Sequence, residues 1–508
     1  MARWFHDRHP GRGIPSVSLR RLLPEARFVG CADLEVSGCT ADSRRLHPGQ
    51  VFVAVRGETH DGHEFVAKAL ERGAAGVVVE HACPEAGRLQ VVVPDSRAAL
   101  ARLFQALAGD PSETLTTFGV TGTAGRTAAA VFARSVFAAT GARFGLVGRL
   151  GWSDGREARA VGVGSEEARG VAEMLAAMVE AGCGGAVLEF GYEAIGRRAA
   201  EGIAFDAVAV TDLGGGPGLW PDEVIARRTA SARLVRRVAP GGAVVVNADD
   251  PHAELLGAVN LDARRVSFGL LAPADVSVRI DRLDRDGSRI RLLGFDREVC
   301  LTLRVPGVRA VSQALAAAAL AWSQGVDGGA VAEGLEAVSE LPGRLDAVDE
   351  GQPFAVFVDA ATLGHDLQDA LESLRSITPE PGKIHCVLGA EGLRPGGNRE
   401  RLRLAAVAEG LADRVTLTTN NPRTEDPERI VDDLLAGFER PGRVRVEPDR
   451  TLAIEAALAD ALPGDAVLIA GKGRASLQIL ADRAEPFDDA SVARRWLRNR
   501  RFEARRSA

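Results

Sequence analysis

A glycine- and threonine-rich turn between two apolar stretches is the part of this chain best suited by its spacing to chemistry. It reads Gly119-Val120-Thr121-Gly122-Thr123-Ala124-Gly125-Arg126-Thr127, after the apolar lead-in 115–120 and before the apolar helical stretch 128–139. In such a turn, successive backbone N–H groups and a helix N-terminus point at one anion. The usual phosphate-binding loop adds a lysine for the terminal phosphates and a Ser or Thr hydroxyl for Mg²⁺. Thr127 supplies the hydroxyl, but Arg126 holds the lysine position, so the turn predicts a nucleotide site with an altered cation.

Polar residues follow several short apolar runs that we expect to be strands. In the middle of the chain these runs are 116–120, 185–189, 207–211 and 243–247, and in the last third they are 355–359, 385–389, 415–419 and 466–470. Their alternation with helical patterns predicts parallel sheets buried on both faces. Ligands of such sheets bind beyond the carboxyl ends of the strands. The candidates at those ends are Glu189, Thr211-Asp212, Asn247–Asp250, Asp359, Asn420–Arg423 and Gly471-Lys472-Gly473.

Length and local pattern predict three α/β domains. A chain of 508 residues is too long for one core, and typical domain sizes predict about three. Short α/β units with strands expected at 50–56 and 75–79 fill the first part, and new units begin near 111 and near 343. We therefore expect domains at 1–110, 111–340 and 341–508. Within the second, 276–303 alternates with period two, and Asp286-Gly287 predicts its hairpin turn.

Composition excludes several classes of protein. The sequence contains no run of 18 apolar residues that would predict a membrane span, and no apolar leader that would predict secretion. Six scattered cysteines without a CxxC pair indicate reduced thiols, and the net charge of −7 argues against nucleic-acid binding. We therefore expect a cytoplasmic protein with no membrane and no nucleic-acid partner. Only three lysines occur, Lys68, Lys383 and Lys472, so any lysine-dependent chemistry can be checked by inspection.

The motifs, in this order, resemble the Mur ligase family, and within it the ligases that add the third residue of the peptidoglycan stem peptide. The resemblance runs from about residue 38 to residue 490. The segments that carry it are Ala41-Asp42-Ser43-Arg44, Pro48-Gly49, Asp61-Gly62-His63, Gly119–Thr127, Asn247–Pro251, Gly343-Arg344, Asn421–Pro427 and Gly471-Lys472-Gly473. The Arg of Asn421-Pro422-Arg423 resembles the diaminopimelate-adding subtype.

The resemblance implies a fold and a reaction. The fold would be α/β, with a uridine-binding N-terminal domain, a central P-loop-like parallel sheet and a Rossmann-like C-terminal domain. ATP with Mg²⁺ would phosphorylate the carboxylate of a UDP-MurNAc-dipeptide, and an amino acid such as diaminopimelate would then attack to form an amide. Such phosphoryl transfer depends on positioning and on neutralising the charge that develops.

The resemblance also implies roles for individual residues. Catalytic roles fall on Arg126, Glu189 and Asp359. Nucleotide contacts fall on Gly122, Thr123, Gly125, Arg126, Thr127, Arg344 and Asp359. The metal would lie on Thr127 and Glu189. Substrate contacts fall on Ser43, Arg44, Arg399, Asn421, Pro422, Arg423 and Gly471.

The chain departs from the family where phosphates, metal and amine should meet. The departures are Ala124 and Arg126 in the loop, Gly191-Tyr192-Glu193, the stretch 212–219 with Pro217 at a metal-binding His, Ser231 at the carbamylated Lys, Ala310, Ala360-Ala361-Thr362, Asn420 and Arg474-Ala475. Losing one charge-stabilising group costs roughly 10²–10³ in rate. Several such losses in one site predict almost no turnover.

Structural alternatives stay open for most of these residues. Arg126 fits a phosphate clamp or an internal ion-pair partner, and Glu189 fits a metal ligand or an ion pair with an Arg. Ser43-Arg44 fits a uridine contact or a capped turn. Arg423 fits a carboxylate fork or a salt bridge with Glu425 or Asp426. For Lys472 the glycine neighbours favour a tight structural turn.

Two functions therefore remain, from different classes. The favoured one is a pseudo-ligase that keeps the scaffold to bind a ligand or a partner enzyme, such as a motif-complete Mur ligase. The alternative is an active ATP-dependent amide ligase with an altered site. A relative of folylpolyglutamate synthase is disfavoured, because that group lacks the domain marked by Asp42-Ser43-Arg44.

Overall fold

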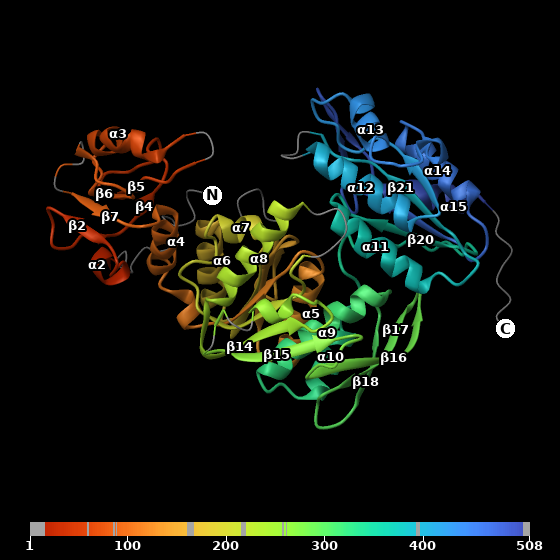
Figure 1. The fold of residues 1–508 in the computed structure, drawn as a ribbon, viewed down its shortest axis with the longest axis horizontal. Coiled ribbons are helices and arrows are strands. Elements are labelled where there is room, and N and C mark those ends of the chain that lie inside the picture. The colour runs from red at the N-terminus through yellow and green to blue at the C-terminus, as the bar shows by residue number, and fades with distance from the viewer. Residues whose placement is uncertain are drawn as a thin grey trace.

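The computed structural model has three β-sheets of five or more strands, each covered by its own helices. They follow one another along the longest axis of the molecule (Figure 1). The structure describes residues 16–57, 60–84, 87, 89–159, 167–214, 220–256, 259–260, 262–392 and 397–500. Of the divergent stretch 212–219, only 212–214 are therefore described, and Pro217 lies outside the described residues. Within those ranges no helix has the length and apolar character needed to cross a bilayer.

The N-terminal sheet has five strands in the order β2-β7-β6-β5-β4. They are β2 (Arg27–Val29), β4 (Cys39–Thr40), β5 (Val51–Val53), β6 (Gly76–Val79) and β7 (Gln90–Val92). β1 (Val17–Ser18) and β3 (Glu35–Val36) form a separate pair, and the helices are α2 (Leu19–Leu22), α3 (Val66–Glu71) and α4 (Ser96–Leu107). The strands expected at 50–56 and 75–79 are confirmed as β5 and β6.

The middle sheet has eleven strands in the order β11-β10-β9-β12-β8-β13-β14-β15-β16-β17-β18. They are β8 (Thr116–Thr121), β9 (Phe144–Gly148), β10 (Gly151–Ser153), β11 (Ala158–Arg159), β12 (Gly185–Glu189), β13 (Phe205–Val210), β14 (Val238–Asn247), β15 (Arg264–Gly269), β16 (Val276–Asp284), β17 (Gly287–Leu293) and β18 (Val299–Leu303). The pairs from β9 to β16 are parallel, as the apolar runs predict. The helices are α5 (Arg126–Ala139), α6 (Ala168–Glu180), α7 (Tyr192–Gly196), α8 (Pro221–Val235), α9 (Val308–Ser323) and α10 (Gly328–Glu336).

The hairpin at the edge of the middle sheet turns one residue earlier than predicted. Asp284 pairs with Gly287, so Arg285 and Asp286 form the turn. Gly287 belongs to β17, with φ of 141°, and a side chain there would overlap the carbonyl oxygen of Leu303 on β18. Close strand approach, rather than the turn itself, therefore requires this glycine.

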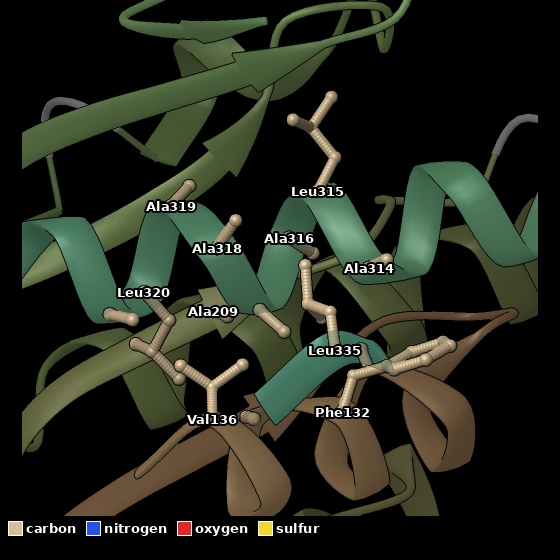
Figure 2. Close-up of a cluster of buried hydrophobic side chains, with 14 of the residues drawn as sticks. Phe132, Val136, Ala209, Ala314, Leu315, Ala316, Ala318, Ala319, Leu320 and Leu335 are labelled. Atoms are coloured by element: carbon tan, nitrogen blue, oxygen red, sulfur yellow. The ribbon is translucent and has the colours of Figure 1, made fainter. Parts of the chain in front are cut away.

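The main core of the middle domain lies where α9 packs against α5 and α10. Figure 2 shows the alanine-rich α9 beside Phe132 and Val136 of α5 and Leu335 of α10. Small side chains let these helices approach closely, and a side chain at Gly334 of α10 would overlap the Cα of Val136. Tight packing of this kind is sensitive to single added methyl groups. It fixes α5, and with it the turn that precedes α5.

The C-terminal sheet has six strands in the order β19-β20-β24-β21-β22-β23. They are β19 (Asp346–Ala347), β20 (Ala355–Asp359), β21 (Ile384–Leu388), β22 (Arg414–Leu417), β23 (Arg445–Val446) and β24 (Ala466–Ala470). The helices are α11 (Gly364–Ile377), α12 (Gly397–Leu411), α13 (Pro427–Leu435), α14 (Arg450–Asp460) and α15 (Asp489–Arg498), and β25 (Leu477–Ile479) pairs with β26 (Ala484–Pro486). The strands expected at 355–359, 385–389, 415–419 and 466–470 are thus present.

Candidate functional site

The glycine- and threonine-rich turn links the end of β8 to the start of α5. Gly122 has φ of 139° and Gly125 has φ of 74°, both in the range that favours glycine. A side chain at Gly122 would overlap Thr211 Oγ1, and one at Gly125 would lie 2.8 Å from Gln313 Nε2. Thr211 Oγ1 also donates to the carbonyl oxygen of Ala124 at 2.6 Å. The turn therefore has a compact shape that its glycines make possible.

A carboxylate from the neighbouring strand end lies in this turn. Asp212 follows β13, and its Oδ1 accepts the backbone N–H of Thr123 at 2.5 Å while its Oδ2 accepts that of Ala124 at 3.2 Å. Burial raises the pKa of Asp212, although these hydrogen bonds and Arg126 act in the opposite direction. Two N–H groups that a phosphate would use are thus engaged by a side chain of the same chain.

Arg126 turns back onto its own loop. Its Nη1 donates to the carbonyl oxygens of Gly122 at 2.5 Å and Thr123 at 2.8 Å. Its Nε lies 3.8 Å from Glu189 Oε1, and the side chain is only 16% exposed. Of the two interpretations left open by the sequence, this geometry is that of an internal ion-pair partner.

Thr127 and Glu189 are brought together, as a shared metal would require. Thr127 Oγ1 donates to Glu189 Oε1 at 2.7 Å, and the backbone N–H of Arg149 donates to Glu189 Oε2 at 3.0 Å. Both side chains are buried. In the described part of the chain, no group of three or more His, Cys, Asp or Glu residues could hold a metal ion. The two predicted ligands are therefore neighbours that presently satisfy each other.

Arg344, Asp359 and Asp366 form a buried charged cluster in the C-terminal domain. Asp359 ends β20, and its Oδ2 accepts the backbone N–H of Leu345 at 2.8 Å. Arg344 donates to Asp366 at 2.6 Å and lies 3.7 Å from Asp359 Oδ1. Burial raises the pKa of Asp359 to about 6, against the opposing effect of Arg344. Asp359 Oδ1 is buried and has no hydrogen-bond partner among the described residues, so it is a free acceptor.

A cleft between the middle and C-terminal domains joins this cluster to the turn. It has a cavity volume of about 50 Å³ and is lined by Gly125, Thr127, Arg344 and Asp359 together with Arg309 and Asp369. Arg309 of α9 lies 3.3 Å from Asp369 Oδ1 of α11 and also pairs with Glu372. Burial raises the pKa of Asp369 to about 7, Arg309 opposes that rise, and the Asp212 carboxylate adds to it. The lining of the cleft thus carries three aspartates, Asp359, Asp366 and Asp369, and two arginines, Arg309 and Arg344.

The segment after β24 is held by an internal lysine. Lys472 Nζ donates to Asn421 Oδ1 at 3.0 Å and to the carbonyl oxygen of Leu477 at 2.7 Å. Its side chain is buried, and burial lowers its pKa to about 8. Asn421 Oδ1 also accepts the backbone N–H of Ile479 at 3.0 Å. This geometry agrees with the structural turn that the neighbouring glycines favour.

Arg423 is exposed beside this segment. It has φ of 57°, and its backbone N–H donates to the carbonyl oxygen of Ile479 at 3.1 Å. Arg401 takes Glu425 through two bonds of 2.7 Å, and no ion pair of Arg423 with Glu425 or Asp426 occurs among the described contacts. No ion pair of Arg423 occurs within the described ranges. Its guanidinium thus remains available for a carboxylate.

The remaining C-terminal candidates are spread over this domain. Gly471, with φ of 116°, faces Asn420, because a side chain there would lie 2.8 Å from Asn420 Nδ2. Pro422 is buried, and its carbonyl oxygen closely approaches Gly392. Arg399 stacks over Trp220 of the middle domain at 4.9 Å and lies 3.6 Å from Asp222. Arg399 is therefore an interdomain contact in this structure.

The N-terminal candidates form a local turn. Asp42 Oδ1 accepts the backbone N–H of Arg44 at 3.0 Å and its Nε at 2.9 Å, while Arg72 donates to the carbonyl oxygen of Ser43 at 2.6 Å. Ser43 is buried, and the Arg44 side chain is 80% exposed. This is the capped-turn geometry that the sequence left as the alternative to uridine contact. The uridine role of both residues stays a prediction.

Sequence reasoning missed several charged residues in and beside the cleft. Arg309, Asp366 and Asp369 line it, and Arg149 bonds Asp366. Asp212 is predicted only as a strand-end residue in a divergent stretch. The strand-end rule carried the one usable signal, because Asp212 follows β13 and β13 lies next to β8. The other four depend on how the domains meet.

The residues present fit only part of the nucleotide and metal that the resemblance implies. Asp359 Oδ1, which lies 3.7 Å from Arg344 and makes no hydrogen bond among the described residues, suits a hydroxyl donor of a ligand. The phosphate end does not fit, because Asp212 holds the turn N–H groups and Arg126 holds the turn carbonyls. Mg²⁺ prefers six oxygen ligands, and here Thr127 and Glu189 supply two that bond each other.

Comparisons with known proteins agree with this architecture. Residues 35–107 match the Mur ligase family, catalytic domain; residues 120–321 match the Mur ligase middle domain; and residues 343–473 match the Mur ligase, glutamate ligase domain. The chain is 35% identical over 492 residues to the UDP-N-acetylmuramyl-tripeptide synthetase of Roseiflexus sp. (strain RS-1), covering 91% of this chain and 94% of that protein. The three-domain α/β fold and a matched relative of this length show that the chain belongs to the Mur ligase family.

Within the family, the predicted resemblance to ligases of the third stem-peptide residue is confirmed. The chain is 30% identical over 480 residues to the UDP-N-acetylmuramoyl-L-alanyl-D-glutamate--2,6-diaminopimelate ligase of Syntrophomonas wolfei subsp. wolfei, covering 93% of this chain and 96% of that one. A solved structure of a ligase with the same name has a TM-score of 0.67 at 24% identity, covering 96% of this chain and 99% of the other. That structural likeness shows the fold alone.

Proposed function

We propose that this protein works in the metabolism of UDP-MurNAc-peptide precursors as a pseudo-ligase, binding a precursor or a partner enzyme without forming the amide bond efficiently. The observation that carries the proposal is the position of Arg126. Its guanidinium bonds two carbonyls of its own turn and lies 3.8 Å from Glu189. A side chain committed in this way does not neutralise terminal phosphates.

No lysine of the middle domain replaces the missing one. The sequence has no lysine between Lys68 and Lys383, so neither the loop ammonium nor a carbamylated lysine is available in the middle domain. Arg and Lys differ in this role, because a planar guanidinium does not fit between β- and γ-phosphates as a compact ammonium does. Phosphoryl transfer depends on such cations more than on covalent chemistry. The expected result is a rate too low for biosynthesis.

Family membership supports the choice of ligand. The relatives named above act on nucleotide-linked muramoyl peptides, and the chain matches the family along all three domains. We therefore propose a UDP-MurNAc-peptide as the ligand, a motif-complete Mur ligase as the kind of partner, and the cytoplasm as the compartment. Nothing in the proposal requires a nucleic acid or a membrane.

The active-ligase alternative keeps two observations in its favour. Thr127 and Glu189 lie together at 2.7 Å, where one Mg²⁺ would need them. Arg423 is exposed without an ion pair among the described residues, as a carboxylate fork for a diaminopimelate-like amino acid would be. If the turn rearranged around ATP, these residues could serve the family's reaction.

Calorimetry and phosphate release separate the two. The purified full-length protein is titrated with a UDP-MurNAc-dipeptide, and phosphate release is then followed with ATP, Mg²⁺, the dipeptide and diaminopimelate. We expect precursor binding at micromolar strength, roughly −8 kcal/mol, and no phosphate release above a no-enzyme blank. Phosphate release that depends on diaminopimelate would overturn the proposal in favour of the active ligase. Absence of precursor binding would overturn the ligand and leave the partner enzyme, which a pull-down with the organism's complete Mur ligase would test.

A further inference from the structure

The Asp212 carboxylate lies where a phosphate-binding turn holds its anion. Its two oxygens accept the N–H groups of Thr123 and Ala124 at 2.5 and 3.2 Å, just before the N-terminus of α5. Backbone N–H groups and the positive end of a helix favour one negative group in that place. The turn therefore already has its anion.

The backbone on both sides of Asp212 is fixed. Thr211, before it, bonds the turn through Oγ1 to Ala124 at 2.6 Å, and the backbone N–H of Leu213, after it, donates to Asp250 Oδ2 at 2.6 Å. The Asp212 carboxylate is therefore held in the turn by the contacts of Thr211 and Leu213 as well as by its own hydrogen bonds.

The charges around Asp212 do not offset a second anion. Arg126 of α5 and Arg309 of α9 are the cations that face it, and both already bond other groups. The Asp212 carboxylate also helps to raise the pKa of Asp369 of α11, so negative charge at these two residues is mutually unfavourable. A phosphate entering the turn would meet the Asp212 carboxylate on the same N–H groups, where repulsion between buried charges is strong.

We propose that Asp212 determines the ligand specificity of the turn, by standing in for a phosphate and so excluding nucleoside di- and triphosphates. The inference rests on the proposed function, since both place the change at the phosphate end of the site. It goes further by naming Asp212 as the residue that excludes phosphates from the turn. It also predicts that removing the charge of Asp212 allows ADP to bind. An Asn at 212 keeps the shape and one acceptor for the turn.

The test compares ADP with adenosine, both in the presence of Mg²⁺, by calorimetry on the full-length protein. Wild-type protein is expected to bind ADP no more tightly than adenosine. D212N is expected to bind ADP at least tenfold more tightly than wild type, with less than a threefold change for adenosine. D212S is the second variant, in case the amide distorts the turn. D250N is the control for the neighbouring backbone contact, because it removes a nearby charge that bonds Leu213 and not the N–H groups of the turn.

Several results would overturn the inference. One is wild-type protein that binds ADP tenfold more tightly than adenosine. Another is folded D212N and D212S that gain no ADP affinity, and a third is D250N that gains as much as D212N. Failure of this inference is distinguishable from failure of the proposed function. If the variants gain no ADP affinity while the wild-type protein binds the precursor and releases no phosphate, only the role of Asp212 is contradicted. If the wild-type protein releases phosphate but binds ADP no more tightly than adenosine, only the pseudo-ligase function is contradicted.

Discussion

Arg149 and Asp366 connect the middle domain to the C-terminal domain. Arg149 Nη1, just after β9, donates to Asp366 Oδ2 in the first turn of α11 at 2.9 Å. The backbone N–H of the same Arg149 holds Glu189, and the same Asp366 also accepts Arg344 at 2.6 Å. One pair of residues therefore links the candidate metal ligand of one domain to the charged cluster of the other.

Removing the charge of Asp366 should destabilise this junction. Asp366 is buried, and D366N leaves Arg149 without its carboxylate and Arg344 with only Asp359 at 3.7 Å. Breaking a buried pair from one side typically costs about 3–5 kcal/mol. We expect the free energy of unfolding, measured by urea denaturation at pH 7, to fall by that amount. D482N, which breaks an exposed contact with Arg483, should change it by less than about 0.5 kcal/mol. Equal effects of the two variants would contradict the role given to Asp366.

The raised pKa of Asp369 should make stability depend on pH with a definite sign. Its folded pKa of about 7 lies above the ordinary value of 3.8. Between roughly pH 4 and pH 7 the folded protein therefore holds a proton that the unfolded chain has lost, and this residue's contribution to stability falls as pH rises. D369N removes the ionisation, while Arg309 keeps Glu372 as its partner.

Relative to wild type, D369N should therefore gain about 1–3 kcal/mol in unfolding free energy on going from pH 4 to pH 8. Urea denaturation at pH 4, 6 and 8 measures the difference between the two proteins. Taking this difference cancels the contributions of groups common to both, including Asp359, whose pKa is also raised. A difference that stays flat with pH would show that Asp369 ionises normally.

Local pattern was enough to predict the strands and the turn. β12 and β20 have the predicted bounds, because a short apolar run bounded by Gly or charge has few other ways to be buried on both faces. The turn was predictable for a similar reason. Its glycines encode a backbone conformation, and conformation is a local property of the chain.

The state of the site was not predictable in the same way. Arg126 bonds the carbonyls of its own turn, and Asp212 enters that turn from 89 residues away in sequence. Arg149 meets Asp366 across 217 residues. Such contacts depend on which strands are neighbours and on how two domains meet, neither of which is encoded by periodicity or spacing. The sequence showed which groups were changed, but not what the changed groups bind.

Gly122 should tolerate an alanine worse than a surface glycine of similar conformation. G122A places a methyl group against Thr211 Oγ1 at φ of 139°, whereas Gly241 has φ of 79° with no atom within 4 Å of the added methyl group. Left-handed strain costs about 1–2 kcal/mol at either site, and overpacking adds about 1–3 kcal/mol at Gly122 only. The thermal midpoint of G122A should therefore fall clearly below that of G241A. Matching midpoints would mean that the turn can open to accept the methyl group.

Lys472 and Arg423 should separate a structural role from a binding role in the C-terminal domain. K472M removes the hydrogen bonds to Asn421 and Leu477 from a buried site, and the unpaired carbonyl left behind costs about 1–3 kcal/mol.

R423A removes an exposed side chain without an ion pair in the described part of the chain, so it should change stability by less than about 0.5 kcal/mol. Urea denaturation measures both, and calorimetric titration with diaminopimelate in the presence of the UDP-MurNAc-dipeptide measures binding. R423A should weaken diaminopimelate binding at least tenfold while the protein stays fully stable, because the Arg423 guanidinium is exposed and has no ion pair among the described residues. An R423A protein that loses stability but keeps its amino-acid affinity would reverse the two assignments.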